Sequence, residues 1–201
     1  MKTNPFFAFS SSVFCLVLTL STASFAESLP AGCGNDRGAS PATMGDDVVI
    51  TDSTVLAPLT QTLFPVVKMS AETLQKDVNK GIAKYYLKPE EREPRRFVII
   101  NGKTYSSDGR ELISTHNKNK DTMNYVMDAA GNMYLFDEFT CKQIRHGNIL
   151  AGGPVAGAGN ISIKDGEIVS IDSDSGHYGS TRVFNNVLKR LELSGSKPQH
   201  P

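Results

Sequence analysis

The stretch ISIKDGEIVSI, residues 161–171, decides the class of fold. Two β-branched runs flank Asp165-Gly166, and both of these turn residues tolerate the positive φ angles of a tight type I′ turn. The isoleucines alternate with polar residues, as they do in a strand that buries one face. The pattern therefore predicts a two-residue β-hairpin whose isoleucines face the core.

The same signature recurs earlier in the chain. Asn101-Gly102 separates the runs 97–100 and 103–105, and a turn around Gly131 separates 124–127 from 133–136. A further turn leads into a run at 110–114. Consecutive hairpins without intervening helices favour an antiparallel meander over a parallel βαβ sheet.

Two helices are expected beside this sheet. Ser70 is a favourable N-cap for a helix over residues 71–86, and Ser180 or Thr181 can cap a last helix. Apolar residues recur at helical spacing in both segments: Leu74, Val78, Ile82 and Tyr85 in the first, and Val183, Phe184, Val187, Leu188 and Leu191 in the second. We therefore expect an α+β fold, an antiparallel β-meander with an N-terminal and a C-terminal flanking helix.

The chain divides into four segments by composition. Residues 1–26 have a basic start, an apolar run and a small-residue cleavage signal, which is typical of a secretory signal peptide. Residues 27–69 are expected to form a partly irregular N-terminal arm, 70–193 a single α+β domain, and 194–201 a flexible tail. Cleavage near Ala26 would deliver a secreted or periplasmic protein.

Charge and cysteine content limit the classes of binding partner and indicate the state of the cysteines. Lys+Arg and Asp+Glu balance at 21 each, so nothing favours binding to nucleic acid, and no later segment is apolar enough to span a membrane. Cys15 leaves with the predicted signal peptide. Cys33 and Cys141 then remain as a pair in an oxidising compartment, where a disulfide is the expected state.

The candidate site lies near the C-terminus. His146 follows Arg145, and His177 lies in the run Ser175-Gly176-His177-Tyr178. Histidine suits acid–base chemistry near neutral pH, so His146, His177 and Tyr178 are the candidate catalytic residues. The alternative is that each histidine only fastens its loop by a ring hydrogen bond.

A glycine-rich segment follows the first histidine. Its backbone could face a ligand, which makes Gly152, Gly153, Gly157 and Gly159 candidate ligand-binding residues, together with Arg145 and Ser175. The alternative is that the small residues allow close backbone packing. The segment lacks the Lys-Ser/Thr of a phosphate loop and the G-x-G-x-x-G of a dinucleotide fold. No zinc or calcium motif is complete, so we expect no metal site, and the sequence identifies no cofactor.

Residues 86–193 resemble the region that follows the calmodulin-binding motif in plant IQ-motif-containing calmodulin-binding (IQM) proteins. A similar segment ends some bacterial toxin-like proteins. The run from Tyr86 to Glu93 is similar to the family's Y-L-x-P-x-E-R-E, and an N-G-K turn follows at 101–103. His146 with 150–153 is similar to H-S-S-F-L-A-G-G, and 175–178 matches S-G-H-Y.

The chain also departs from that family pattern. Gly147-Asn148 stands in place of the family's Ser-Ser, and Gly179 stands where a proline is expected. The IQ motif itself is absent, so calmodulin binding does not carry over. The resemblance implies a shared domain with a shared pair of histidine loops, but it supplies no reaction.

Three functional hypotheses remain open from the sequence. The first is a small secreted enzyme, a toxin or effector, that uses the histidine loops on an unknown protein or small-molecule target. The second is a non-catalytic secreted binding module that uses the same loops. The third is a structural domain without a ligand. Whether the protein is an enzyme is not decided by the sequence.

Overall fold

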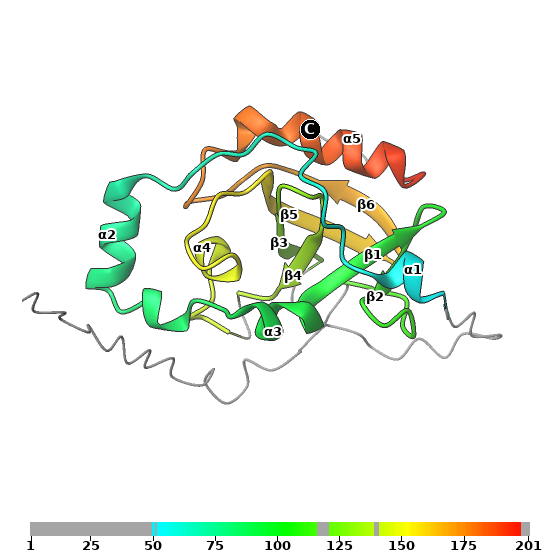
Figure 1. The fold of residues 1–201 in the computed structure, drawn as a ribbon, viewed down its shortest axis with the longest axis horizontal. Coiled ribbons are helices and arrows are strands. Elements are labelled where there is room, and N and C mark those ends of the chain that lie inside the picture. The colour runs from blue at the N-terminus through cyan, green and yellow to red at the C-terminus, as the bar shows by residue number, and fades with distance from the viewer. Residues whose placement is uncertain (1–49, 51, 116–120, 139–140, 198–201) are drawn as a thin grey trace, which may run out of the picture.

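The computed structural model describes residues 50, 52–115, 121–138 and 141–197 (Figure 1). The predicted signal peptide, most of the predicted arm, Cys33 and the end of the predicted tail lie outside these residues. The strands and the longer helices all fall between Ser53 and Leu193.

The predicted hairpins are present. Strands β1 (Arg96–Ile100) and β2 (Lys103–Ser106) pair across Asn101-Gly102, and β5 (Gly157–Lys164) pairs with β6 (Glu167–Ile171) across Asp165-Gly166. All four turn residues have positive φ, from 49° to 80°, as a type I′ turn requires. Strands β3 (Met123–Met127) and β4 (Met133–Phe136) form the third hairpin.

The isoleucines of the β5–β6 hairpin face the core, as predicted. Ile161 and Ile163 on β5 are fully buried, and Ile168 and Ile171 on β6 are 7% and 1% exposed. The two residues on β6 are three positions apart, so strict alternation would send them to opposite faces. A register shift at Ser162/Ile163 inserts the extra residue that lets both point inward.

The prediction of a simple meander is wrong in its strand order. The antiparallel sheet closes into a barrel in the order β1-β2-β6-β5-β3-β4, with β4 pairing back to β1. Turn signals specify only the local pairs. The pairings β3–β5, β2–β6 and β1–β4 join distant segments and remove the free edges that a meander would leave. The run 110–114 forms only one bridge, Tyr105 to Leu112.

Two apolar clusters lie on opposite faces of β3, β4 and β5. One fills the barrel and includes Tyr125, Met127 and the isoleucines of β5, with Val187 and Leu191 from helix α5 (Phe184–Leu193). The other includes Val126, Phe136 and Tyr178. Because both faces are covered, every residue of β3 and β4 is buried. The histidine loops pack against this second cluster, which contains Tyr178 itself and the Phe136 ring that contacts His146.

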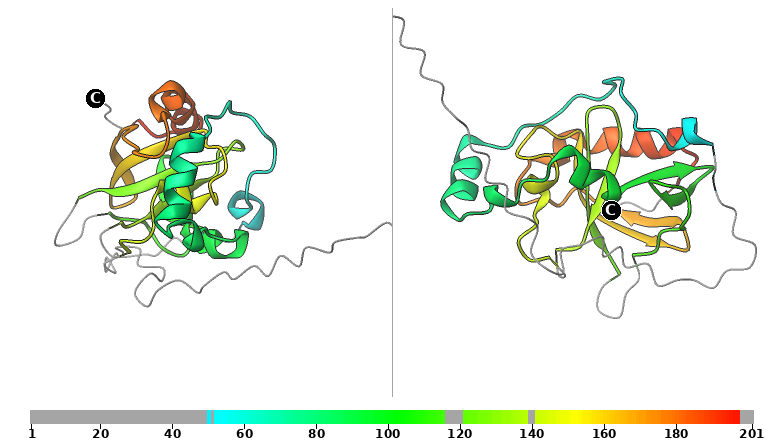
Figure 2. Two further views of the ribbon diagram at one scale, coloured as in Figure 1. Left: turned by 90° about the vertical axis from the view of Figure 1, so that its left-hand side faces the viewer. Right: turned by 60° about the horizontal axis from the view of Figure 1, so that its bottom comes forward.

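The helices differ in how they join this core. Helix α5 continues the 3-10 turn η3 (Ser180–Val183) and lies along the barrel (Figure 1). Helix α2 (Ala71–Asn79) lies at the far edge of the molecule and is followed by the 3-10 turn η1 (Ala83–Tyr85) (Figures 1 and 2). The helix predicted over 71–86 is therefore interrupted, because Gly81 adopts a positive φ of 68°.

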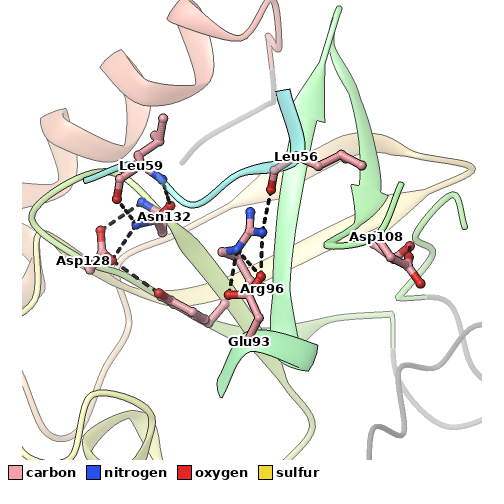
Figure 3. Close-up of polar contacts among 9 residues, drawn as sticks. Leu56, Leu59, Glu93, Arg96, Asp108, Asp128 and Asn132 are labelled. Carbon is pink, nitrogen blue, oxygen red and sulfur yellow. Dashed lines mark hydrogen bonds and ion pairs between the residues drawn. The ribbon is translucent and has the colours of Figure 1, made fainter. Parts of the chain in front are cut away.

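Residues 53–69, which we call the strap, run from helix α1 (Ser53–Leu56) across the barrel to α2. Side chains of the barrel hold the strap by its backbone (Figure 3). The Asn132 amide donates to the carbonyl oxygen of Leu59 at 2.8 Å and accepts from its N–H at 2.7 Å, while the Arg96 guanidinium donates to Leu56 O at 2.6 Å. These bonds fix the path of the strap toward α2.

The Arg96 guanidinium also pairs with the Glu93 carboxylate, in the turn η2 (Glu93–Arg95) that follows helix α3 (Pro89–Arg92). The carboxylate of Asp128 accepts a bond from the amide of Asn132 (Figure 3). It accepts another from the hydroxyl of Tyr134. The polar contacts below the strap thus form two small networks in which the charged groups have partners.

Candidate functional site

His146 opens the short helix α4 (His146–Ile149) and is buried, with 5% of its surface exposed. Its Nε2 lies 3.1 Å from the carbonyl oxygen of Gly159 and 3.4 Å from the amide nitrogen of Asn124. The shorter contact, to a carbonyl that only accepts, favours the tautomer with the proton on Nε2. The imidazole meets the Phe136 ring edge-on, with centroids 5.3 Å apart. Burial lowers the pKa of His146 below its ordinary 6.5, so the ring is neutral at pH 7.

His177 has a different environment. Its Nε2 lies 3.4 Å from Oδ1 of Asp77, on helix α2, and its side chain is 14% exposed while that of Asp77 is 4% exposed. The other carboxylate oxygen of Asp77 accepts from the Tyr86 hydroxyl at 3.2 Å. Burial and the Asp77 charge together raise the pKa of Tyr86 to about 12, so this hydroxyl stays protonated and can donate.

The two histidine loops meet at Gly147. A Cβ at this position would lie 3.2 Å from Cδ2 of His177, 3.3 Å from Oδ2 of Asp77 and 2.6 Å from Cε of Met69. The proximity of His177 also contributes to the lowered pKa of His146. The loops are thus neighbours, but the two rings contact different partners, a carbonyl for His146 and a carboxylate for His177.

Tyr178 ties the two loops together. Its side chain is buried, and its hydroxyl donates to the carbonyl oxygen of Gly153 at 2.8 Å. Burial, with smaller contributions from Tyr86 and Asp77, raises the pKa of Tyr178 above its ordinary value. A protonated hydroxyl held by a carbonyl anchors the second histidine loop to the glycine-rich segment.

The glycine-rich segment packs closely in this structure. The N–H of Gly152 donates to Gly147 O and that of Gly153 to Leu150 O, both at 2.8 Å. The next two N–H donors, Val155 and Ala156, also bond carbonyls, those of Val67 and Met127. These four N–H groups are bonded within the protein, so they do not form an anion cradle.

Close contacts explain several of these glycines. A Cβ on Gly157 would lie 2.2 Å from Val187 Cγ2, and one on Gly159 would lie 2.2 Å from the Asp172 carbonyl oxygen. A Cβ on Gly152 would lie 3.0 Å from the Tyr86 ring, and Gly152 has a φ of 75°. The packing interpretation of these residues accounts for what is observed.

The remaining predicted ligand-binding residues lie at the edge of this cluster. Arg145 forms an ion pair with the Glu138 carboxylate, and its N–H donates to the side chain of Asn148 at 2.8 Å, which fixes the start of α4. Ser175 differs, because its hydroxyl oxygen is buried and has no hydrogen-bond partner within the described part of the chain. This hydroxyl lies in the same loop as His177.

Sequence reasoning missed Asp77 and Tyr86. Asp77 lies on an amphipathic helix, where an acidic residue ordinarily faces solvent, and nothing in its spacing to His177 across 100 positions suggests a contact. Tyr86 was noted only as the start of a family-like motif. Helical periodicity is right for Leu74, which packs against the second apolar cluster, but wrong for Val78, which is 59% exposed while Asp77 is only 3% exposed.

Two further predictions concern cysteines and metals. Cys141 is buried at 5% exposure, and Cys33 lies outside the described residues, so the disulfide stays a prediction. No group of three or more His, Cys, Asp or Glu side chains suited to a metal ion occurs in residues 50, 52–115, 121–138 and 141–197. In the same ranges no helix has both the length and the apolarity to cross a membrane.

Comparison with known proteins supports the family resemblance. Residues 91–184 match the IQ motif-containing protein middle domain. A relative, the IQ domain-containing protein IQM3 of Arabidopsis thaliana, is 32% identical over 94 residues, which cover 46% of this chain and 20% of that protein. No solved structure matches the chain.

The matched segment contains both histidine loops and the whole barrel, whereas Asp77 and Tyr86 precede it. The resemblance to the plant IQM proteins that the motifs predicted is thus confirmed, and over residues 91–184 this chain is similar to their middle domain.

Proposed function

We propose that the protein is an exported enzyme of the effector or toxin type, in which His146 and His177 serve one site. The observation that carries the proposal is the contact of the two histidine loops at Gly147, where the backbone next to His146 faces the ring of His177. The two imidazoles in these adjacent loops have different partners: His146 is buried against a carbonyl and burial lowers its pKa, whereas His177 lies beside a carboxylate.

The two histidines take different roles in this proposal. His177 is partly exposed and is the group that exchanges a proton with the target. His146 is buried and bonds the Gly159 carbonyl through Nε2, so it orients the loop and the backbone beside it. The loop that carries His177 and Tyr178 completes the surface on which a target would bind, and the unpartnered hydroxyl of Ser175 is buried beneath it.

A non-catalytic binding module is the second candidate. It is favoured by the backbone N–H groups of the glycine-rich segment, four of which are bonded within the protein and cannot stabilise a reacting oxyanion. In that case the partly exposed His177 would only bind a protein or a small ligand.

Export is part of the proposal and rests on the composition of residues 1–26. With it goes the Cys33–Cys141 disulfide, which would close a loop of about 100 residues and add up to about 4–5 kcal/mol of stability in the chain-entropy model. Thiol titration of the exported, denatured and unreduced protein should find no free thiol. Two free thiols would end this part of the proposal.

The test of the shared site uses His146→Ala, His177→Ala and the double variant, with the exposed Lys142→Ala as control. Each variant is assayed for growth inhibition of cells exposed to the protein and for thermal stability. We expect both single variants to lose the effect and the double variant to be little worse, because groups that act as a unit are strongly non-additive. Loss of stability that fully accounts for the loss of effect would contradict the proposal.

A further inference from the structure

We propose that Asp77 is the positioning residue for His177, so that the site is completed by a helix that lies before the segment shared with the IQM middle domain. The inference rests on the proposed function, because it assigns the residue that prepares His177 for proton transfer. The matched segment supplies both histidine loops, whereas α2 precedes that segment in this chain.

Helix α2 buries an acidic side chain. Asp77 is the helix's one buried residue, at 3% exposure, while Val78 on its apolar stripe is 59% exposed. A buried carboxylate is costly unless it has charged or hydrogen-bonding partners. Helix α2 therefore contacts the site through its acidic side chain, which meets His177 at 3.4 Å.

The carboxylate is held from a second side. The Tyr86 hydroxyl donates to Oδ2 at 3.2 Å, which leaves Oδ1 to face His177. The Tyr86 ring lies against Gly152, where a Cβ would come within 3.0 Å of it. The glycine-rich segment thereby buttresses the tyrosine that orients the carboxylate, and the absence of a side chain at Gly152 has a role in the site.

The geometry determines which histidine nitrogen can act. A carboxylate beside Nε2 favours the tautomer that carries its proton there, which leaves the lone pair on Nδ1. Among the described residues no hydrogen bond to Nδ1 is present, and the side chain is partly exposed. We therefore assign Nδ1 of His177 as the atom that accepts a proton from the target, with Asp77 stabilising the imidazolium that forms.

The test compares Asp77→Asn, Asp77→Ala and Tyr86→Phe with the parent protein. Glu72→Gln is the matched control, because Glu72 lies on the same helix but pairs with Lys76 at the surface. Two readouts are used: growth inhibition, and the ¹⁵N NMR signature of the His177 ring at pH 8, which identifies the protonated nitrogen. His177→Ala assigns the signal.

We expect the parent and the control to show the Nε2–H tautomer. Both Asp77 variants should shift the ring toward a mixture of tautomers and lose at least about tenfold in effect, because a misoriented general base is a poor one. Tyr86→Phe should lose less, since the carboxylate remains. An Nδ1–H ring in the parent, or Asp77 variants with unchanged tautomer and effect, would overturn the inference.

The outcomes also separate this inference from the proposed function. If His177→Ala keeps its full effect, the proposed function fails, whatever the Asp77 variants do to the ring. If His177→Ala loses the effect while both Asp77 variants retain it, the proposed function stands and the positioning role of Asp77 is wrong.

Discussion

His146 and His177 occupy adjacent loops but belong to different kinds of environment. His146 is almost fully buried and contacts a backbone carbonyl and an aromatic ring. His177 reaches the surface and faces a carboxylate from a distant helix. The comparison shows that a histidine's sequence motif is a weak guide to its role, because the partner atoms decide whether the ring fastens a loop or can exchange a proton.

The largest loss of stability should come from Gly159→Ala, which disturbs the backbone carbonyl that His146 contacts. The new Cβ would lie 2.2 Å from the Asp172 carbonyl oxygen, so the backbone that accepts from His146 must move. We expect a loss of about 3 kcal/mol in the free energy of unfolding, as in severe overpacking. Chemical denaturation measures it.

Gly176→Ala is the matched control for that substitution, because a Cβ there would have nothing within 4 Å. Gly176 lies next to His177, so this substitution also tests how tightly the His177 loop is packed. Its unfolding free energy should stay within about 0.5 kcal/mol of the parent. Equal losses at the two glycines would contradict the contrast between a packed and an open loop.

The next largest effect separates the histidines themselves. His146→Ala removes a buried ring together with its contacts to the Gly159 carbonyl and the Phe136 ring, which should lower the free energy of unfolding by about 2 kcal/mol. His177→Ala should cost about 1 kcal/mol, since its ring is partly exposed and Asp77 keeps the Tyr86 hydroxyl. Denaturant titration of both variants at pH 8 tests the order. A larger loss for His177→Ala would reverse the assignment of roles.

A smaller effect is expected from pH. Burial holds the pKa of folded His146 below 6.5, so the unfolded chain takes up the proton first as the pH falls. The stabilisation from this residue is complete above pH 6.5 and is lost below it, with a slope of at most about 1.4 kcal/mol per pH unit. Unfolding measured from pH 8 to 5 should show a steeper fall for the parent than for His146→Gln. Parallel curves would contradict the neutral, buried state of His146.

Local sequence patterns predicted the parts of the fold that local chemistry determines. The turns at Asn101-Gly102 and Asp165-Gly166 have their expected conformation because two adjacent residues of the right type suffice for a type I′ turn. Barrel closure depends on pairings such as Met123 with Ile161, between strands that no turn joins. No spacing rule reveals such pairings, so the strand order was not predictable.

The candidate site, like the fold, was predictable only where local sequence determines it. Motif spacing identified the loops of His146 and His177, and both loops do come together at Gly147. The carboxylate that faces His177 lies 100 positions away on a helix whose apolar periodicity gave no reason to expect a buried acid. A buried acid on an amphipathic helix becomes visible only when the tertiary structure is known, so Asp77 could not be found from the sequence.

The central claim is that Asp77 and His177 act as a pair, and a double-mutant cycle on stability tests it most directly. Asp77→Ala, His177→Ala and the double variant are unfolded at pH 5.5, where an imidazole is ordinarily protonated. We predict a coupling energy of about 1 kcal/mol between the two positions, and additivity when Glu72→Ala replaces Asp77→Ala. A coupling energy within about 0.3 kcal/mol of zero for Asp77 and His177 would contradict the account.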